Sequence, residues 1–145
     1  MKRADLSDET GSTLLLTIFY GFLGLVLVLL VVAATSLYLE RKRLFTLADG
    51  AALAGAEAFE LDRVAMTPDG PRPLLTSPDV TDAVSSYLAL APHSFEGLAM
   101  ERAETVDGRS ATVQLSAYWR PPVVSLLVPD GIRIDVTAVA RSVFS

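Results

Sequence analysis

The chain has 145 residues, a mean hydropathy of +0.43 and a net charge of −5, so there is room for about one domain. It contains no cysteine and one histidine, which excludes disulfides, thiolate metal sites and a typical zinc centre. Residues 44–145 carry seven arginines, 13 acidic residues and no lysine, and this local charge of −6 disfavours binding to nucleic acid or to an anionic lipid surface.

The first predicted element is an apolar helix. Thirty residues between Glu9 and Glu40 carry no charge. A helix needs about 20 such residues to cross a bilayer core, whereas the apolar part of a signal peptide has about 7–15. The run is followed by the basic triplet 41–43 instead of a small-residue cleavage pattern. We therefore predict a transmembrane helix over residues 11–39, preceded by a short N-terminal segment, residues 1–10.

The helix is predicted to continue beyond the membrane as an Ala-rich segment over residues 40–62, because residues 36–47 contain neither Gly nor Pro. Small residues then recur at helical spacing and allow another backbone to approach closely. This candidate helix-packing face consists of Ala48, Ala51, Ala52, Gly55 and Ala56. Two uses fit the pattern equally well, namely contact with a partner helix in an assembly and packing on the chain's own domain.

A loop and a second helix follow. Residues 67–73 contain three prolines and one glycine, a composition typical of a loop. Ser77 is the predicted N-cap of the next helix, with Pro78 at its first position and Asp79 favourable to the helix dipole. The helix is predicted to end before Pro92. Its apolar side consists of Val80, Val84, Tyr87, Leu88 and Ala91.

The remaining residues alternate with the period of strands. Apolar and polar residues alternate over residues 110–119 and again over 132–141, and a weaker strand is predicted over 98–106. Asp107 and Gly108 form the dipeptide typical of a type I′ hairpin turn. Residues 77–145 are therefore predicted to form a small α+β domain, a short helix packed on a three-stranded antiparallel sheet.

The N-terminal region resembles a known family. Gly11 and Ser12 precede the apolar run, and the basic triplet is followed by residues 47–56, Leu-Ala-Asp-Gly-Ala-Ala-Leu-Ala-Gly-Ala. This order resembles the TadG-like and TadE-like proteins of the tight-adherence (Flp) pilus system, whose span precedes an Ala-Asp-x-Ala-Ala-Leu-Ala-x-Ala segment. The likeness covers about the first 60 residues, and residues 132–141 more loosely resemble the closing strand of those proteins.

The resemblance implies a pilin-like α+β fold in a bacterial pilus-assembly or secretion component, with residues 1–10 cytoplasmic and residues 77–145 extracytoplasmic. Charges flanking the span weakly favour the opposite orientation. Two basic residues, Lys2 and Arg3, precede the span and three follow it, and the more basic side tends to be cytoplasmic. The implied partners are the lipid bilayer and other membrane proteins or pilin-like subunits of the machine, including a second copy of the chain. A peptidase-processed pilin has Glu five residues after the cleaved Gly, where this chain has Leu16, so an uncleaved anchor is expected.

No residues predict catalysis. His93 lies beside Ser94, a spacing that seldom permits proton transfer, and the acid pairs Asp79 with Asp82 and Glu101 with Glu104 are typical of solvated faces. Trp119 is predicted to be a core or rim anchor. We expect no cofactor, no small-molecule substrate and no nucleic acid. The leading hypothesis is a structural component of a pilus machine. A minor pilin-like subunit within the fibre and a membrane-tethered binding or sensing module remain as alternatives.

Overall fold

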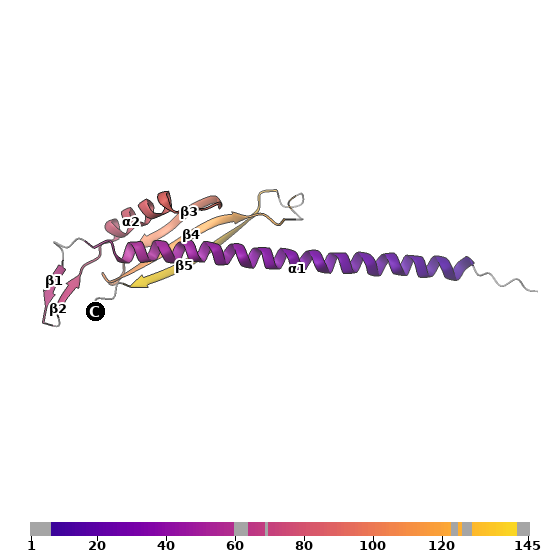
Figure 1. Ribbon diagram of the computed structural model, residues 1–145, viewed down its shortest axis with the longest axis horizontal. Coiled ribbons are helices and arrows are strands. Elements are labelled where there is room, and N and C mark those ends of the chain that lie inside the picture. The colour runs from indigo at the N-terminus through magenta and orange to yellow at the C-terminus, as the bar shows by residue number, and fades with distance from the viewer. Residues whose placement is uncertain (1–6, 60–63, 69, 123–124, 126–128, 142–145) are drawn as a thin grey trace, which may run out of the picture.

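The computed structural model describes residues 7–59, 64–68, 70–122, 125 and 129–141. The elements in chain order are α1 (Ser7–Ala56), β1 (Val64–Thr67), β2 (Gly70–Pro73), α2 (Ser77–Leu90), β3 (Glu96–Glu104), β4 (Ser110–Trp119) and β5 (Ile132–Arg141). Strands β3, β4 and β5 form an antiparallel sheet in that order, whereas β1 and β2 form a separate hairpin. Figure 1 shows α1 as a long rod that lies along the sheet with its C-terminal half and projects alone with its N-terminal half. The predicted α+β class is confirmed.

Helix α1 runs without interruption from the apolar segment into the Ala-rich segment, as predicted. Threonine hydroxyls within it donate to the carbonyl four residues back, and those of Thr17 and Thr35 do so at 2.8 Å. The helix ends at Ala56, where Ala58 N–H donates to the Gly55 carbonyl at 3.3 Å in a tightened final turn. The composition predicts helix to residue 62, but residues 57–59 are not helical, and 60–62 lie outside the described residues.

Both helices lie on one face of the three-stranded sheet. Helix α1 contacts β4 and β5, and α2 contacts α1 and β3 (Figure 1). The alternation predicted for β4 is confirmed, since every second residue of the strand is buried beneath α1. These residues are Ala111, Val113, Leu115, Ala117 and Trp119. In β5 the buried positions are Ile134, Val136 and Ala138. The opposite face of the sheet is covered by no helix among the described residues, and its side chains are mainly polar.

Helix α2 begins one residue earlier than the predicted cap implies. Thr76 is the N-cap, with its Oγ1 accepting from Asp79 N at 3.4 Å and donating to Asp79 Oδ2 at 2.5 Å. Ser77 is therefore the first helical residue and Pro78 the second, where a missing N–H is also tolerated. The predicted end before Pro92 and the apolar side of the helix, centred on buried Val80 and Val84, agree with the structure.

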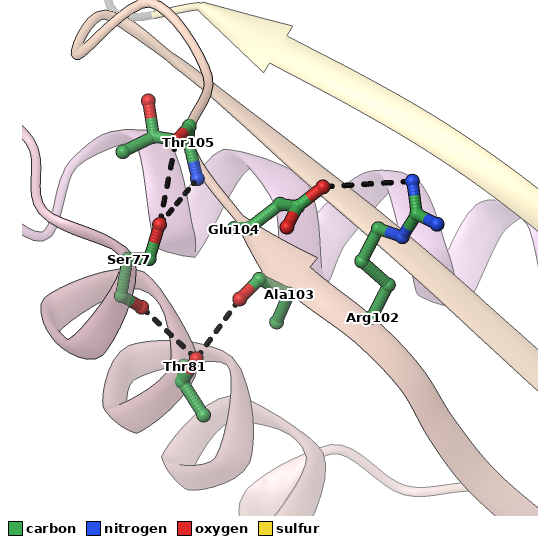
Figure 2. A network of polar contacts seen from close by, with 6 residues as sticks. All are labelled: Ser77, Thr81, Arg102, Ala103, Glu104 and Thr105. Atoms are coloured by element: carbon green, nitrogen blue, oxygen red, sulfur yellow. Dashed lines mark hydrogen bonds and ion pairs between the residues drawn. The ribbon is translucent and has the colours of Figure 1, made fainter.

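The Ser77 hydroxyl, which does not cap α2, joins the helix to the sheet. Figure 2 shows Ser77 Oγ between the backbone N–H and the carbonyl of Thr105, at 3.2 and 3.3 Å. One turn later, Thr81 Oγ1 lies 2.9 Å from the carbonyl oxygens of both Ser77 and Ala103. Two small hydroxyl side chains thus fix α2 against the end of β3.

Two turns differ from their predictions. Strand β3 ends at Glu104 and β4 begins at Ser110, so a five-residue loop connects them. Of its described residues only Gly108 has a positive φ, +66°, whereas a type I′ turn requires positive φ at both central positions, so the predicted turn type is wrong. Asp107 stabilises the longer loop by accepting hydrogen bonds from the N–H groups of Arg109 and Ser110 at 2.9 and 2.7 Å.

The Pro-rich segment predicted as a loop instead contributes strand β2. Its register pairs Val64 with Pro73 and Met66 with Pro71. Pair types alternate along an antiparallel ladder, so two prolines that are two residues apart occupy the same type of pair. Proline is tolerated in the type whose backbone nitrogens face away from the partner strand, because no ladder hydrogen bond is lost there. Figure 1 places this hairpin at the end of the domain farthest from the free half of α1.

Candidate functional site

The candidate packing face lies inside the domain. Ala48, Ala51, Ala52 and Ala56 are fully buried, and Gly55 is buried with them. The four alanines belong to the hydrophobic core that α1 forms with β5, β4 and α2 of the same chain. The five residues therefore form a helix-packing face whose neighbours belong to the chain's own domain, which is one of the two uses that fit the sequence. Use of the same face by a second chain stays a prediction.

Glycine at one position of this face, Gly55, and at nearby Gly50 allows α1 and α2 to approach closely. A Cβ built on Gly55 would lie 3.0 Å from Val80, 3.2 Å from Val84 and 3.2 Å from Ala111. A Cβ on Gly50 would overlap the Tyr87 hydroxyl oxygen. Each glycine lowers helix stability by about 0.8–1 kcal/mol relative to Ala, and the packing of α2 against α1 offsets this cost. The small residues thus set the distance between the two helices.

Nearer the N-terminal half of α1, larger side chains replace the small ones. Leu44 is fully buried and Leu47 nearly so, and Leu37 packs against the same core. Trp119, at the end of β4, is 7% exposed, and its indole Nε1 donates to Ser36 Oγ on α1 at 3.2 Å. The predicted role of Trp119 as a core anchor agrees with this placement. The contact fixes the end of the sheet to α1 where the helix leaves the domain.

The N-terminal half of α1, which we call its bare half, projects from the domain and is covered by no other described element (Figure 1). From Leu14 to Val32 its large apolar side chains are exposed by 43% or more, except for Val26 and Leu29, which are partly exposed. The helix is long and apolar enough to cross a bilayer core, and no residue of its most apolar window is buried. In water such a surface would be strongly unfavourable, since burying each large apolar side chain is worth about 1.5–3 kcal/mol.

His93, Glu101 and Glu104 each contact a different partner. The ring of exposed His93 stacks on Phe95 at a centroid distance of 6.2 Å. Glu104 pairs with Arg102 at 3.5 Å, while Glu101 bonds to other partners on the open face of the sheet. Within the part of the chain that the structure describes, no three His, Asp or Glu side chains gather to hold a metal.

One polar cluster on the open face was not predicted from the sequence. A bulge in β3 leaves Glu101 without a register partner between Met100 and Arg102. The displaced carboxylate accepts from Ser116 Oγ at 2.6 Å and from Arg133 of β5. The hydrogen bond from Ser116 is the largest cause of the lowered pKa of Glu101. Burial opposes it, and the hydrogen bond and positive charge of the Arg133 guanidinium lower the pKa further. The bulge cannot be identified from the alternation of residues 98–106, because an extra residue leaves no mark in composition.

Shallow grooves surround α1 where it leaves the domain. One of them, between α1 and β5, has a volume of about 430 Å³ and lies against Leu37, Tyr38, Arg41 and Ile134. On the other side of α1, a groove of about 450 Å³ lies between Arg43, Tyr87 and the segment that follows α2. These grooves are open to the surface.

In the comparison with known proteins, the N-terminal segment matches a family model. Residues 11–58, about a third of the chain, match the Tad family model, described as "Putative Flp pilus-assembly TadE/G-like". The match begins at Gly11 and ends two residues after α1, so it covers both the bare and the packed half of the helix. It confirms the resemblance drawn from these residues, whereas residues 132–141 lie outside the match. No curated protein and no solved structure matches the chain significantly.

Proposed function

We propose that the chain is a single-pass membrane component of a tight-adherence (Flp)-type pilus assembly or secretion apparatus, with a structural role and no catalysis. The observation that carries the proposal is the family match over residues 11–58. The matched segment is α1, whose bare half has the length and composition of a membrane span and whose other half holds the domain. An anchored assembly component needs both of these properties.

The proposed orientation places residues 1–10 in the cytoplasm and the domain, residues 77–145, outside the membrane. The resemblance to TadG-like and TadE-like proteins supports it. The basic residues that flank the span weakly favour the opposite orientation, so the proposal depends on the resemblance and not on the charge count. The basic triplet 41–43 then lies on the outer side, immediately beneath the domain.

The proposed partners are other membrane proteins of the pilus machine or pilin-like subunits, including a second copy of the chain. The small residues of α1 are occupied within the domain, so the bare half of the helix offers the larger surface for such contacts. Within a bilayer these contacts would depend on close packing and not on the hydrophobic effect.

Photocrosslinking in cells tests this function. A photoreactive residue at Leu23, in the bare half of α1, is expected to crosslink to a membrane protein of the pilus machine. Deletion of the chain is expected to abolish surface pili, and the wild-type chain is expected to restore them. Unchanged pili in the deletion strain would contradict the proposal.

The fibre-subunit alternative is supported by one observation, the pilin-like arrangement of a half-bare helix laid on an antiparallel sheet (Figure 1). Leu16 opposes it, because a processed pilin has Glu at this position. Mass spectrometry of the membrane-extracted protein distinguishes the two. The anchor hypothesis predicts no species that begins at Ser12, and recovery of that species would favour the fibre subunit.

A further inference from the structure

A groove runs along the junction of α1 and the edge strand β5. One wall comes from Leu37, Tyr38 and Arg41 of α1, and the other from Arg133 and Ile134 of β5. Its volume of about 430 Å³ lies within the range of small-molecule sites, about 300–1,000 Å³. A second groove of about 340 Å³ shares Tyr38 and Arg41 and continues along β5. Together they form an open channel, which we call the α1/β5 groove.

The groove lies at the height of the bilayer surface. A core of about 20 residues centred in the uncharged run between Glu9 and Glu40 ends near Ala34, which lines the groove. Arg41 lies seven residues farther, or about 10 Å at 1.5 Å per residue. The intervening Tyr38 is 66% exposed, and tyrosine is enriched at membrane interfaces. The lining therefore passes from the edge of the acyl layer through the headgroup layer.

The described lining of the groove carries a net positive charge. Arg41 and Lys42 line it, and no described carboxylate forms an ion pair with either. Arg133 is paired with Glu101, and Asp135 is the one acid on the groove's lining. The net negative charge of residues 44–145 disfavours binding to an anionic lipid surface, but the local charge at this end of the domain is positive.

We propose that the α1/β5 groove binds the headgroup of one anionic phospholipid from the bilayer that α1 crosses; this rests on the membrane anchoring proposed above. Arg41 donates to the lipid phosphate, while Leu37, Tyr38 and Ile134 contact the glycerol and the first part of the acyl chains. Because β5 is the edge of the sheet, with β4 on one side only, the lipid joins that edge to the span and fixes the height of the domain above the membrane.

The full chain in nanodiscs of phosphatidylcholine and phosphatidylglycerol tests the proposal, with retained lipids counted by native mass spectrometry. Wild-type protein is expected to retain one phosphatidylglycerol. Arg41→Gln is expected to reduce that occupancy about five-fold, the effect typical of one basic residue near a charged surface. Arg43→Gln is the matched control, because Arg43 lies at the same height, pairs with Glu40 and lines a different groove. It is expected to change the occupancy less than two-fold.

A second pair of variants separates the groove from its charge. Ala34→Phe fills the groove and is expected to lower phosphatidylglycerol retention, whereas Thr35→Phe adds nearly the same bulk at an exposed neighbouring position and is expected not to. Equal losses in the Arg41 and Arg43 variants, or no retained phosphatidylglycerol in the wild type, would overturn the lipid site while leaving the anchor intact. Failure of the wild type to enter nanodiscs would overturn the anchor itself.

Discussion

Replacing Gly55 by leucine tests whether α1 packs on its own domain as described. The new Cβ would lie 3.0–3.2 Å from Val80, Val84 and Ala111, so the rest of the side chain has no space without separation of α1 from α2. Overpacking typically costs about 1–3 kcal/mol, and four added carbons at a site with three close neighbours place this variant near the upper end.

The expected magnitude includes a smaller opposing effect. Leucine favours the helix over glycine by about 0.8 kcal/mol, so the net loss of stability for Gly55→Leu is about 2 kcal/mol. For a domain of about 100 residues, a loss of 1 kcal/mol lowers Tm by about 4–8 °C, so Tm is expected to fall by roughly 8–16 °C.

Trp119 provides the assay, because it is the chain's one tryptophan and is 7% exposed against α1. Thermal unfolding of the full chain in detergent micelles is followed by its fluorescence. Gly24→Leu is the matched control, since no atom lies within 4 Å of a Cβ at that position. An unchanged Tm for Gly55→Leu, or equal shifts for both variants, would refute the packing described for this face.

Three further variants test other contacts. Ala52→Leu, at a fully buried position, is expected to lower Tm without changing crosslinks to partners, and loss of crosslinks with unchanged Tm would favour an intermolecular face. Ser36→Ala removes the acceptor of the Trp119 indole N–H and is expected to cost about 1 kcal/mol, measured by the same fluorescence transition; no change would show that this bond is not formed. Backbone and hydroxyl donors lower the pKa of Asp107 from 3.8 to about 2, so its stabilising contribution is present above pH 4 and is lost as pH falls toward 2. Asp107→Asn is therefore expected to be less stable than wild type at pH 7 and to approach it near pH 2; a constant difference in Tm would contradict this.

The sequence predicts the regular elements because their signals are local. The uncharged run and the absence of proline predict the continuous α1, and the alternation of apolar residues predicts β4 and the buried side of β5. The neighbours of the small residues could not be predicted, because a close-packed stripe has the same composition whether it faces α2 or another protein. That question depends on contacts between residues far apart in the chain, such as Gly55 with Ala111.

The incorrect local predictions have specific physical causes. Thr76 and Ser77 both suit an N-cap, and Ser77 instead bonds to Thr105 across 28 positions. Asp107 and Gly108 are typical of a two-residue turn, but the Asp107 carboxylate holds a longer loop by accepting backbone hydrogen bonds. In both cases side-chain hydrogen bonds, which composition does not determine, decide between structures of similar local stability.

Labelling of single cysteines tests the central claim most directly, because the natural chain has no cysteine. Ser86→Cys, at an exposed position of α2, and Ser7→Cys, at the start of α1, would be treated in intact spheroplasts with a membrane-impermeant maleimide. An anchored component with its domain outside predicts labelling of the Ser86 variant at once and of the Ser7 variant only after permeabilisation. Labelling in the reverse order, or of both variants before permeabilisation, would contradict the proposed topology.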